Sequence, residues 1–79
     1  MEYMIENWLD FANQVETGVA QIEQGYSDSY LNEILNLIAN IRSESANLTH
    51  MLDGEKEACF LRINKMGTEL KSVACFVGA

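Results

Sequence analysis

The sequence predicts an all-α fold, and two observations carry this prediction. Apolar residues recur at alternating intervals of three and four positions in three separate segments, which places them along one side of an α-helix. The chain has no proline, and its five glycines are well separated, so long helices meet no strong breaker. The alternation of apolar and polar residues that a half-buried strand requires extends over no useful length.

We expect helices over about residues 2–24, 28–52 and 55–77. They form either an antiparallel three-helix bundle or a helical hairpin with one very long arm. A chain of 79 residues is one domain at most, so residues 1–79 are expected to fold as a single helical domain. A core of this size is marginally stable alone, which favours a homodimer or another partner chain.

The first helix has an apolar stripe with flanking residues on one side. The stripe consists of Met4, Trp8, Phe11, Val15, Gly18 and Ile22, flanked by Ile5, Ala12 and Val19. We expect this helix to end near Gly25, because glycine tolerates the left-handed backbone that commonly follows a helix. An oxygen of Ser27, Asp28 or Ser29 is then available to cap the second helix.

The second helix has more apolar residues than one face can hold. Its main stripe is Leu31, Ile34, Ile38, Ile41, Ser45, Leu48 and Leu52, with Ser45 as the polar exception. Tyr30, Leu37 and Met51 form a second line beside it, which Glu44 interrupts, and Leu35 lies on the other flank. Either this helix is central and contacts both neighbours, or part of its apolar arc contacts another chain.

The third helix has the stripe Cys59, Ile63, Met66, Leu70, Val73 and Val77. Before it, Asp53 is a candidate N-cap, but Gly54 could instead continue one long helix at a cost of about 1 kcal/mol, which is the hairpin alternative. Cys75 and Phe76 lie off the stripe. They are expected either to protrude as an apolar contact for a partner or to pack over the open end of the bundle.

Gly18 and Gly67 lie on or beside the stripes of the first and third helices. A glycine inside a helix is costly unless another group occupies the space that its missing side chain leaves. We expect the helices to approach closely there, with Trp8, Phe60 or Tyr30 filling a notch. The alternative is a notch that accepts a side chain from a partner.

The net charge of −7 belongs entirely to the first half of the chain. Residues 1–41 contain seven acids and no lysine or arginine, whereas from Arg42 onward five acids offset five bases. A surface of one sign attracts and steers a basic partner. The predicted contacts on the outer face of the first helix are Glu2, Glu6, Asp10, Glu16 and Glu23. The alternative is a solvated surface that keeps a small protein soluble.

No constellation for catalysis, a metal or a cofactor is present in the sequence. His50 with Asp53 and Glu57 is an incomplete ligand set. Cys59 lies on the core stripe, and Cys75 has no local group that would activate it as a nucleophile. No glycine-rich phosphate loop occurs. We therefore expect a protein that is not an enzyme and that binds neither a metal nor a cofactor.

The sequence indicates a soluble, cytoplasmic protein. Cys59 and Cys75 lie about 24 Å apart along one predicted helix, too far for a disulfide, so reduced thiols are expected. The acidic start MEYMIENWLD is unlike a signal peptide, and no uncharged apolar run approaches the ~20 residues of a membrane span. The lack of a basic patch argues against direct nucleic-acid binding.

The short acidic helical hairpin resembles the small co-chaperones of bacterial secretion systems. It also resembles small acidic phage inhibitors of host defence, such as certain anti-CRISPR proteins. Neither resemblance rests on a motif, so neither assigns a role to a residue. The first hypothesis is an inhibitor or regulator that docks its acidic helix on a basic, nucleic-acid-handling protein. The second is a self-associating adaptor or co-chaperone that binds a partner helix through apolar surface, namely Tyr30, Leu37, Met51, Cys75 and Phe76.

Overall fold

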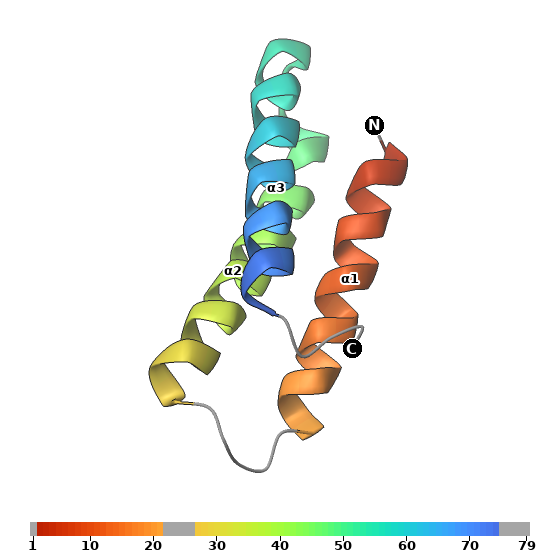
Figure 1. Ribbon diagram of the computed structural model, residues 1–79. Helices are drawn as coiled ribbons and strands as arrows, with labels where there is room; N and C mark the ends of the chain where they lie inside the picture. Colours follow the sequence, from red (N-terminus) through yellow and green to blue (C-terminus); the bar gives the residue numbers. More distant parts are fainter. Residues whose placement is uncertain (1, 22–26, 75–79) are drawn as a thin grey trace.

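The protein is a bundle of three helices. A computed structural model describes residues 2–21 and 27–74, and within these ranges it contains helices and no strand. The elements are α1 (Glu2–Gln21), α2 (Asp28–Asn47), the short 3₁₀-helix η1 (Leu48–His50) and α3 (Asp53–Val73). α2 runs antiparallel to both other helices, so α1 and α3 run in the same direction (Figure 1). The all-α three-helix prediction is confirmed.

The helical backbone is interrupted between α2 and α3, which excludes the hairpin with one long arm. α2 ends at Asn47, η1 adds one tight turn, and Met51 and Leu52 are extended. The predicted second helix was therefore about five residues too long. α3 begins at Asp53, two residues earlier than expected, and Gly54 lies inside its first turn. α3 ends at Val73, with Ala74 as its non-helical C-cap, so the helix predicted to continue to residue 77 was too long. The predicted end of the first helix lies outside the described residues.

The two helix starts that the sequence suggested have different caps. Ser27 caps α2, because its side-chain oxygen accepts a hydrogen bond from the backbone N–H of Tyr30 at 3.2 Å. At α3 the cap is Leu52 and not Asp53, so that prediction was wrong by one residue. The Glu55 carboxylate accepts from the Leu52 N–H at 3.3 Å, which is the half of a capping box that a leucine permits.

Replacing Leu52 with serine is expected to stabilise the fold. The leucine side chain is 74% exposed and offers no acceptor to the free N–H groups of α3, whereas a serine hydroxyl does. We expect the free energy of unfolding to rise by about 1 kcal/mol in urea denaturation. The control is Leu35→Ser, an exposed leucine inside α2, where serine has no cap to form. Equal changes in both variants would contradict the capping argument.

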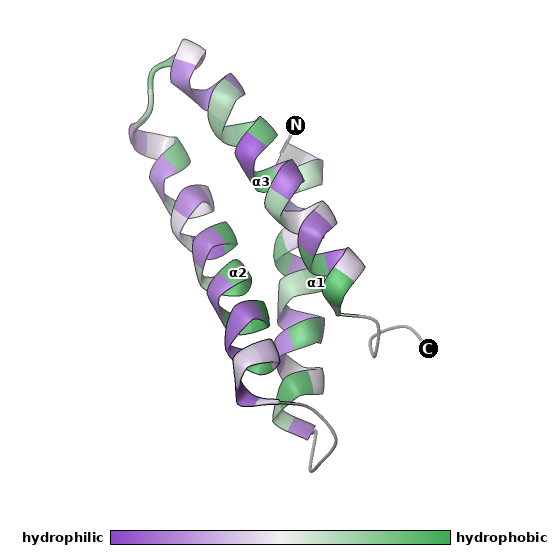
Figure 2. Ribbon diagram, turned by 60° about the vertical axis from the view of Figure 1, so that its left-hand side comes forward, coloured by the Kyte–Doolittle hydropathy of each residue, from purple (hydrophilic) through white to green (hydrophobic). Residues whose placement is uncertain are grey.

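All three helices contribute buried residues to one hydrophobic core. Its buried hydrophobic residues are Ile5, Ala12, Val15, Ile34, Ile38, Ile41, Cys59, Ile63, Leu70 and Ala74. In Figure 2 the hydrophobic residues of α2 face the other helices and its hydrophilic residues follow the outer edge. Ser45 is accommodated because its hydroxyl donates to the Ile41 carbonyl at 2.7 Å. None of the helices described here combines the length and the hydropathy of a membrane span.

Two parts of the predicted stripes need correction. On α1 the flanking residues Ile5 and Ala12 are buried, while Met4, Trp8 and Phe11 are only half-buried. The helix is rotated so that these three larger side chains lie at the boundary with α3. On α2 the stripe stops before Leu52, which is exposed because the helix has already ended.

Candidate protein-binding surface

Trp8 and Gly67 bring α1 and α3 together. A Cβ atom placed on Gly67 would lie 2.3–2.6 Å from three ring atoms of Trp8, so the indole occupies the space that the missing side chain leaves. The indole N–H donates to the side-chain oxygen of Asn64 at 3.3 Å. The ring also makes an edge-on contact with Phe11, with centroids 6.1 Å apart. The notch predicted at Gly67 therefore exists and is filled by Trp8 of the same chain.

Arg42 joins α2 to α1. Its guanidinium donates to both carboxylate oxygens of Glu16, at 2.7 and 3.0 Å, and to the side-chain oxygen of Asn13 at 2.7 Å. The hydrogen bonds and charge of Arg42 hold the pKa of the Glu16 carboxyl below its usual value. Glu16 was predicted to contact a partner, and its carboxylate is already bound within the fold.

Glu44, Cys59 and Arg62 form the corresponding cluster between α2 and α3. Arg62 donates to both oxygens of the Glu44 carboxylate, at 3.3 and 3.0 Å. The buried Cys59 thiol donates to the same carboxylate at 3.1 Å. The hydrogen bond from Arg62, and to a smaller extent that from Cys59, lowers the pKa of the Glu44 carboxyl. Burial raises the pKa of the Cys59 thiol. Glu44 interrupts the second apolar line of α2 because it serves as the acceptor of this cluster.

Acid is expected to destabilise the fold through Glu16 and Glu44. A carboxyl whose pKa is lower in the folded than in the unfolded state stabilises the fold above its ordinary pKa of 4.5. That contribution is lost as the pH falls through the lower, folded pKa. We therefore expect the urea midpoint to fall when the pH is reduced below about 5, and to fall less in a Glu16→Gln, Glu44→Gln variant.

The matched control for this pH dependence is a Glu33→Gln, Glu69→Gln variant. It also removes two carboxylates, and neither takes part in an ion pair within the described residues. This variant should keep the wild-type slope of stability against pH. If all three proteins show one slope, the two arginine pairs do not account for the acid sensitivity.

The outer face of α1 carries the acids that remain available. Glu6 and Asp10 are exposed, and among the residues described neither joins an ion pair. They lie four positions apart and so one turn from each other on the helix. Tyr3, on the same face, is 81% exposed. Of the other predicted acidic contacts, the side chain of Glu2 and all of Glu23 lie outside the described part.

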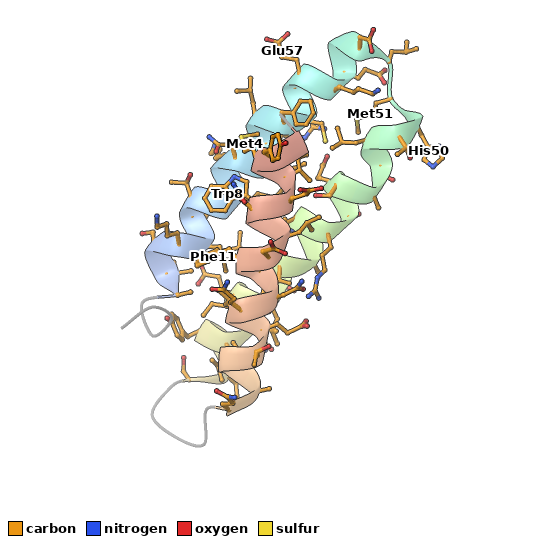
Figure 3. The ribbon with its side chains drawn as sticks, turned by 90° about the vertical axis from the view of Figure 1, so that its right-hand side faces the viewer. Met4, Trp8, Phe11, His50, Met51 and Glu57 are labelled. Atoms are coloured by element: carbon orange, nitrogen blue, oxygen red, sulfur yellow. The ribbon has the colours of Figure 1, made fainter. Side chains whose placement is uncertain are left out.

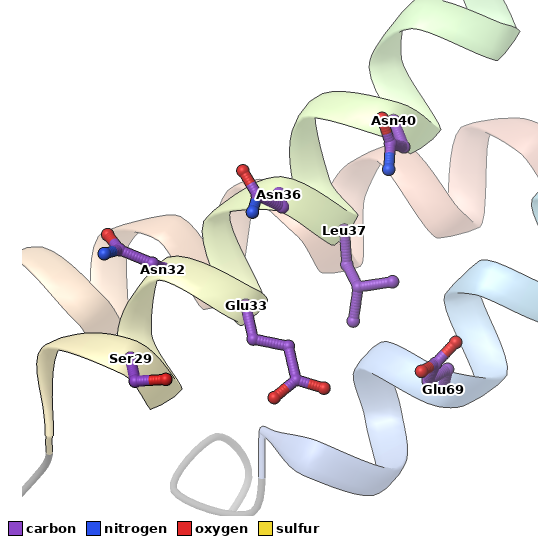
Figure 4. A pocket seen from close by; sticks show the side chains of 7 residues that line it. All are labelled: Ser29, Asn32, Glu33, Asn36, Leu37, Asn40 and Glu69. Atoms are coloured by element: carbon purple, nitrogen blue, oxygen red, sulfur yellow. The ribbon is translucent and has the colours of Figure 1, made fainter.

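The predicted apolar contacts of α2 are partly covered by the protein's own core. Tyr30, Leu37 and Met51 are half-buried and pack against it, and the Tyr30 hydroxyl donates to the Val73 carbonyl. Figure 4 shows Leu37 in a depression whose other lining side chains are polar, namely Ser29, Asn32, Glu33, Asn36, Asn40 and Glu69. Cys75 and Phe76 lie outside the described residues.

A groove with aromatic side chains runs between α1 and α3. Its lining residues are Tyr3, Met4, Asn7, Trp8, Phe11, Asn64 and Lys71, and we call it the α1–α3 groove. Figure 3 shows Met4, Trp8 and Phe11 in a row on the side of α1 that faces α3. Leu61, which is 67% exposed, lies one turn before Asn64 on the same side of α3.

Sequence reasoning did not single out Tyr3 or Leu61 as contacts. A signal was present for Leu61, because it lies midway between the stripe residues Cys59 and Ile63 and so on the opposite side of the helix. Tyr3 directly precedes the stripe residue Met4, and its position in the sequence does not show whether it lies on the buried or the exposed side of the helix.

The described residues do not bring together the side chains that a metal site needs. Across residues 2–21 and 27–74, no group of three or more histidine, cysteine, aspartate or glutamate side chains is arranged to hold a metal ion. His50 lies exposed on η1 at the tip of the α2–α3 hairpin. The arrangement that the described residues do offer is an open surface on α1 and α3.

Comparison of the whole chain with models of protein families, with curated proteins and with solved structures gives no match.

Proposed function

We propose that this protein is an inhibitor or regulator that acts in the cytoplasm by binding a basic, nucleic-acid-handling protein through the outer face of α1. One observation carries the proposal. The first 41 residues contain seven acids and no base, and Glu6 and Asp10 on the exposed face of α1 have no ion-pair partner within the described residues. The carboxylates are free to meet cations of another molecule.

The internal ion pairs leave this face negative. Arg42 is the first base in the sequence, and it binds Glu16 at the boundary between α1 and α2. Arg62 likewise binds Glu44 across α2 and α3. Both arginines thus pair with acids at helix boundaries, and neither pairs with Glu6 or Asp10. Such a one-signed face raises association rates with an oppositely charged protein and sets the orientation of docking.

The class of partner follows from the sign of the charge. Proteins that bind nucleic acid carry clustered lysine and arginine on the surface that contacts phosphates. An acidic helix that occupies such a surface excludes the nucleic acid, which makes inhibition the expected consequence of binding. Small acidic phage inhibitors of host defence, which this chain resembles in size and charge, offer a parallel for this mode of action.

The second candidate is a self-associating adaptor or a co-chaperone that binds a partner helix. It is favoured by the exposed apolar side chains of Tyr3, Leu52 and Leu61. Binding of this kind depends on apolar area and changes little with salt, whereas the acidic-face mechanism weakens as salt screens the charges. Salt dependence therefore separates the two candidates.

The test is affinity capture from the native cell extract at about 50 mM and about 500 mM NaCl, with molar mass measured in parallel. If the proposal is correct, we expect the captured protein to have a pI above about 9 and to be released at high salt. We also expect the nucleic acid that this partner binds to displace it. A partner that stays bound at high salt, or a stable homo-oligomer with no basic partner, would support the second candidate instead.

A further inference from the structure

The α1–α3 groove has the dimensions and lining of a site for one helical segment. Met4 and Phe11, which both line it from α1, are seven residues apart, which corresponds to roughly 10 Å or two turns. A helix that binds in a groove uses anchors at positions i, i+3 or i+4, and i+7, which span the same length. The groove lies between two helices that run in the same direction, so a bound helix would extend the bundle.

The floor of the groove is fixed. Trp8 is seated on Gly67, hydrogen-bonded to Asn64 and in edge-on contact with Phe11. Three independent contacts therefore hold the indole while part of it stays exposed. A rigid aromatic surface loses little conformational entropy on binding, which suits it to anchor an apolar side chain of a partner.

The margins of the groove are apolar and acidic. Tyr3, which lines the groove from α1, and Leu61, one turn before Asn64 on α3, are among the most exposed large hydrophobic residues that the structure describes. Glu6 and Asp10 continue the face of α1 beside Tyr3. Glu57 lies two turns before Asn64 on α3, on the part of that helix that extends past the start of α1 (Figure 3). Lys71 is the cation of the lining, and it lies toward the other end of α3.

We propose that the α1–α3 groove receives an amphipathic helix of the basic partner, with aliphatic side chains on Trp8 and Phe11 and arginine side chains over Tyr3. This inference rests on the proposed function and names the segment that α1 recognises. Arginine fits better than lysine, because its planar guanidinium stacks on an aromatic ring while it donates two hydrogen bonds to a carboxylate such as Glu6.

Charge complementarity selects this occupant over a second copy of the chain. Two copies would each bring a net charge of −7, and this face of α1 has acids and no base. Like charges placed opposite each other weaken association. A basic amphipathic helix provides the opposite sign along the acidic margin and an apolar face for the groove.

Trp8 is the single tryptophan of the chain, so its fluorescence reports directly on binding in the groove. The probes are three tryptophan-free synthetic peptides of about 14 residues, long enough for the anchors of a groove-bound helix. The first has leucines on one helical face and arginines on the other. The second is a scrambled sequence of the same composition. The third has lysine in place of every arginine. Trp8 emission is followed during titration, at low salt and at high salt.

We expect the amphipathic arginine peptide to shift Trp8 emission and to bind at least about tenfold more tightly than the scrambled peptide. Lysine for arginine should weaken binding several-fold. A Tyr3→Ser, Leu61→Ser variant should lose the preference for the amphipathic peptide. The matched control, Leu35→Ser with Leu52→Ser, removes two exposed leucines away from the groove and should keep it. Thermal unfolding of each variant checks that the fold is retained.

The groove, the assignment of arginine and the proposed function are each overturned by a different result. Equal binding of the amphipathic and scrambled peptides, or an unchanged preference in Tyr3→Ser, Leu61→Ser, overturns the groove and leaves the acidic-face mechanism standing. Equal binding of the arginine and lysine peptides overturns the assignment of arginine. A Glu6→Lys, Asp10→Lys variant that binds all three peptides as the wild type does overturns the proposed function, even if the groove preference persists.

Discussion

Replacing Gly67 with alanine is expected to destabilise the protein by about 1–2 kcal/mol, or roughly 5–15 °C in Tm. Alanine is the better helix former, and that preference alone would stabilise α3 by about 1 kcal/mol. The added Cβ, however, would lie 2.3–2.6 Å from the Trp8 ring, well inside van der Waals contact. Because Trp8 is hydrogen-bonded to Asn64 and in contact with Phe11, its ring moves only if those contacts loosen.

Gly54→Ala is the matched control in the same helix. A Cβ at Gly54 meets no atom within 4 Å, so this substitution should leave stability unchanged or raise it by a few tenths of a kcal/mol. Urea denaturation followed by circular dichroism measures both variants. Trp8→Leu combined with Gly67→Ala should cost less than the sum of the two single changes, because the smaller side chain frees the space. Additive effects, or a stabilised Gly67→Ala, would show that the indole does not occupy the notch.

Reversing the charge of Glu6 and Asp10 together is expected to weaken binding of the captured partner by about 100-fold or more at low salt. Two attractions become two repulsions, at positions that are exposed and unpaired among the described residues. Because neither side chain is part of the core, Glu6→Lys, Asp10→Lys should fold with nearly the wild-type stability. Titration calorimetry at two salt concentrations measures the loss, which should shrink as salt rises.

The control for this variant is Glu33→Lys, Glu69→Lys. It changes the net charge by the same amount, on the polar face of α2 and α3 instead of α1. It should weaken binding only several-fold, through the long-range field of the whole molecule. If the two variants lose the same affinity, the partner responds to net charge and not to the face of α1.

Much of the fold could be predicted because periodicity is local information. Ile34, Ile38 and Ile41 on α2, and Cys59, Ile63 and Leu70 on α3, are buried where the stripes placed them. Ser27 is a cap because a short polar side chain before an apolar run has few better roles. The rotation of α1 was not predictable, because Met4, Trp8 and Phe11 are as apolar as Ile5 and Ala12. Only the position of α3 decides which of them are covered.

The contacts between helices were less accessible to sequence reasoning. Arg42 and Glu16 are 26 residues apart, and whether they meet depends on how α1 and α2 are rotated and staggered. The same holds for Glu44, Cys59 and Arg62, whose interaction turns an apparent break in an apolar line into a cluster of hydrogen bonds. Glu16 was therefore assigned to a partner, although Arg42 of the same chain binds it.

We propose that the outer face of α1 contacts the partner, and amide chemical-shift mapping locates such a contact residue by residue. The labelled protein is titrated with the captured basic protein, and the shift of each backbone amide is recorded. We expect the largest changes at Tyr3, Glu6, Asn7 and Asp10, with little change at Asn36 and Asn40 on the outer face of α2. Changes centred on α2, with the amides of α1 unmoved, would contradict it.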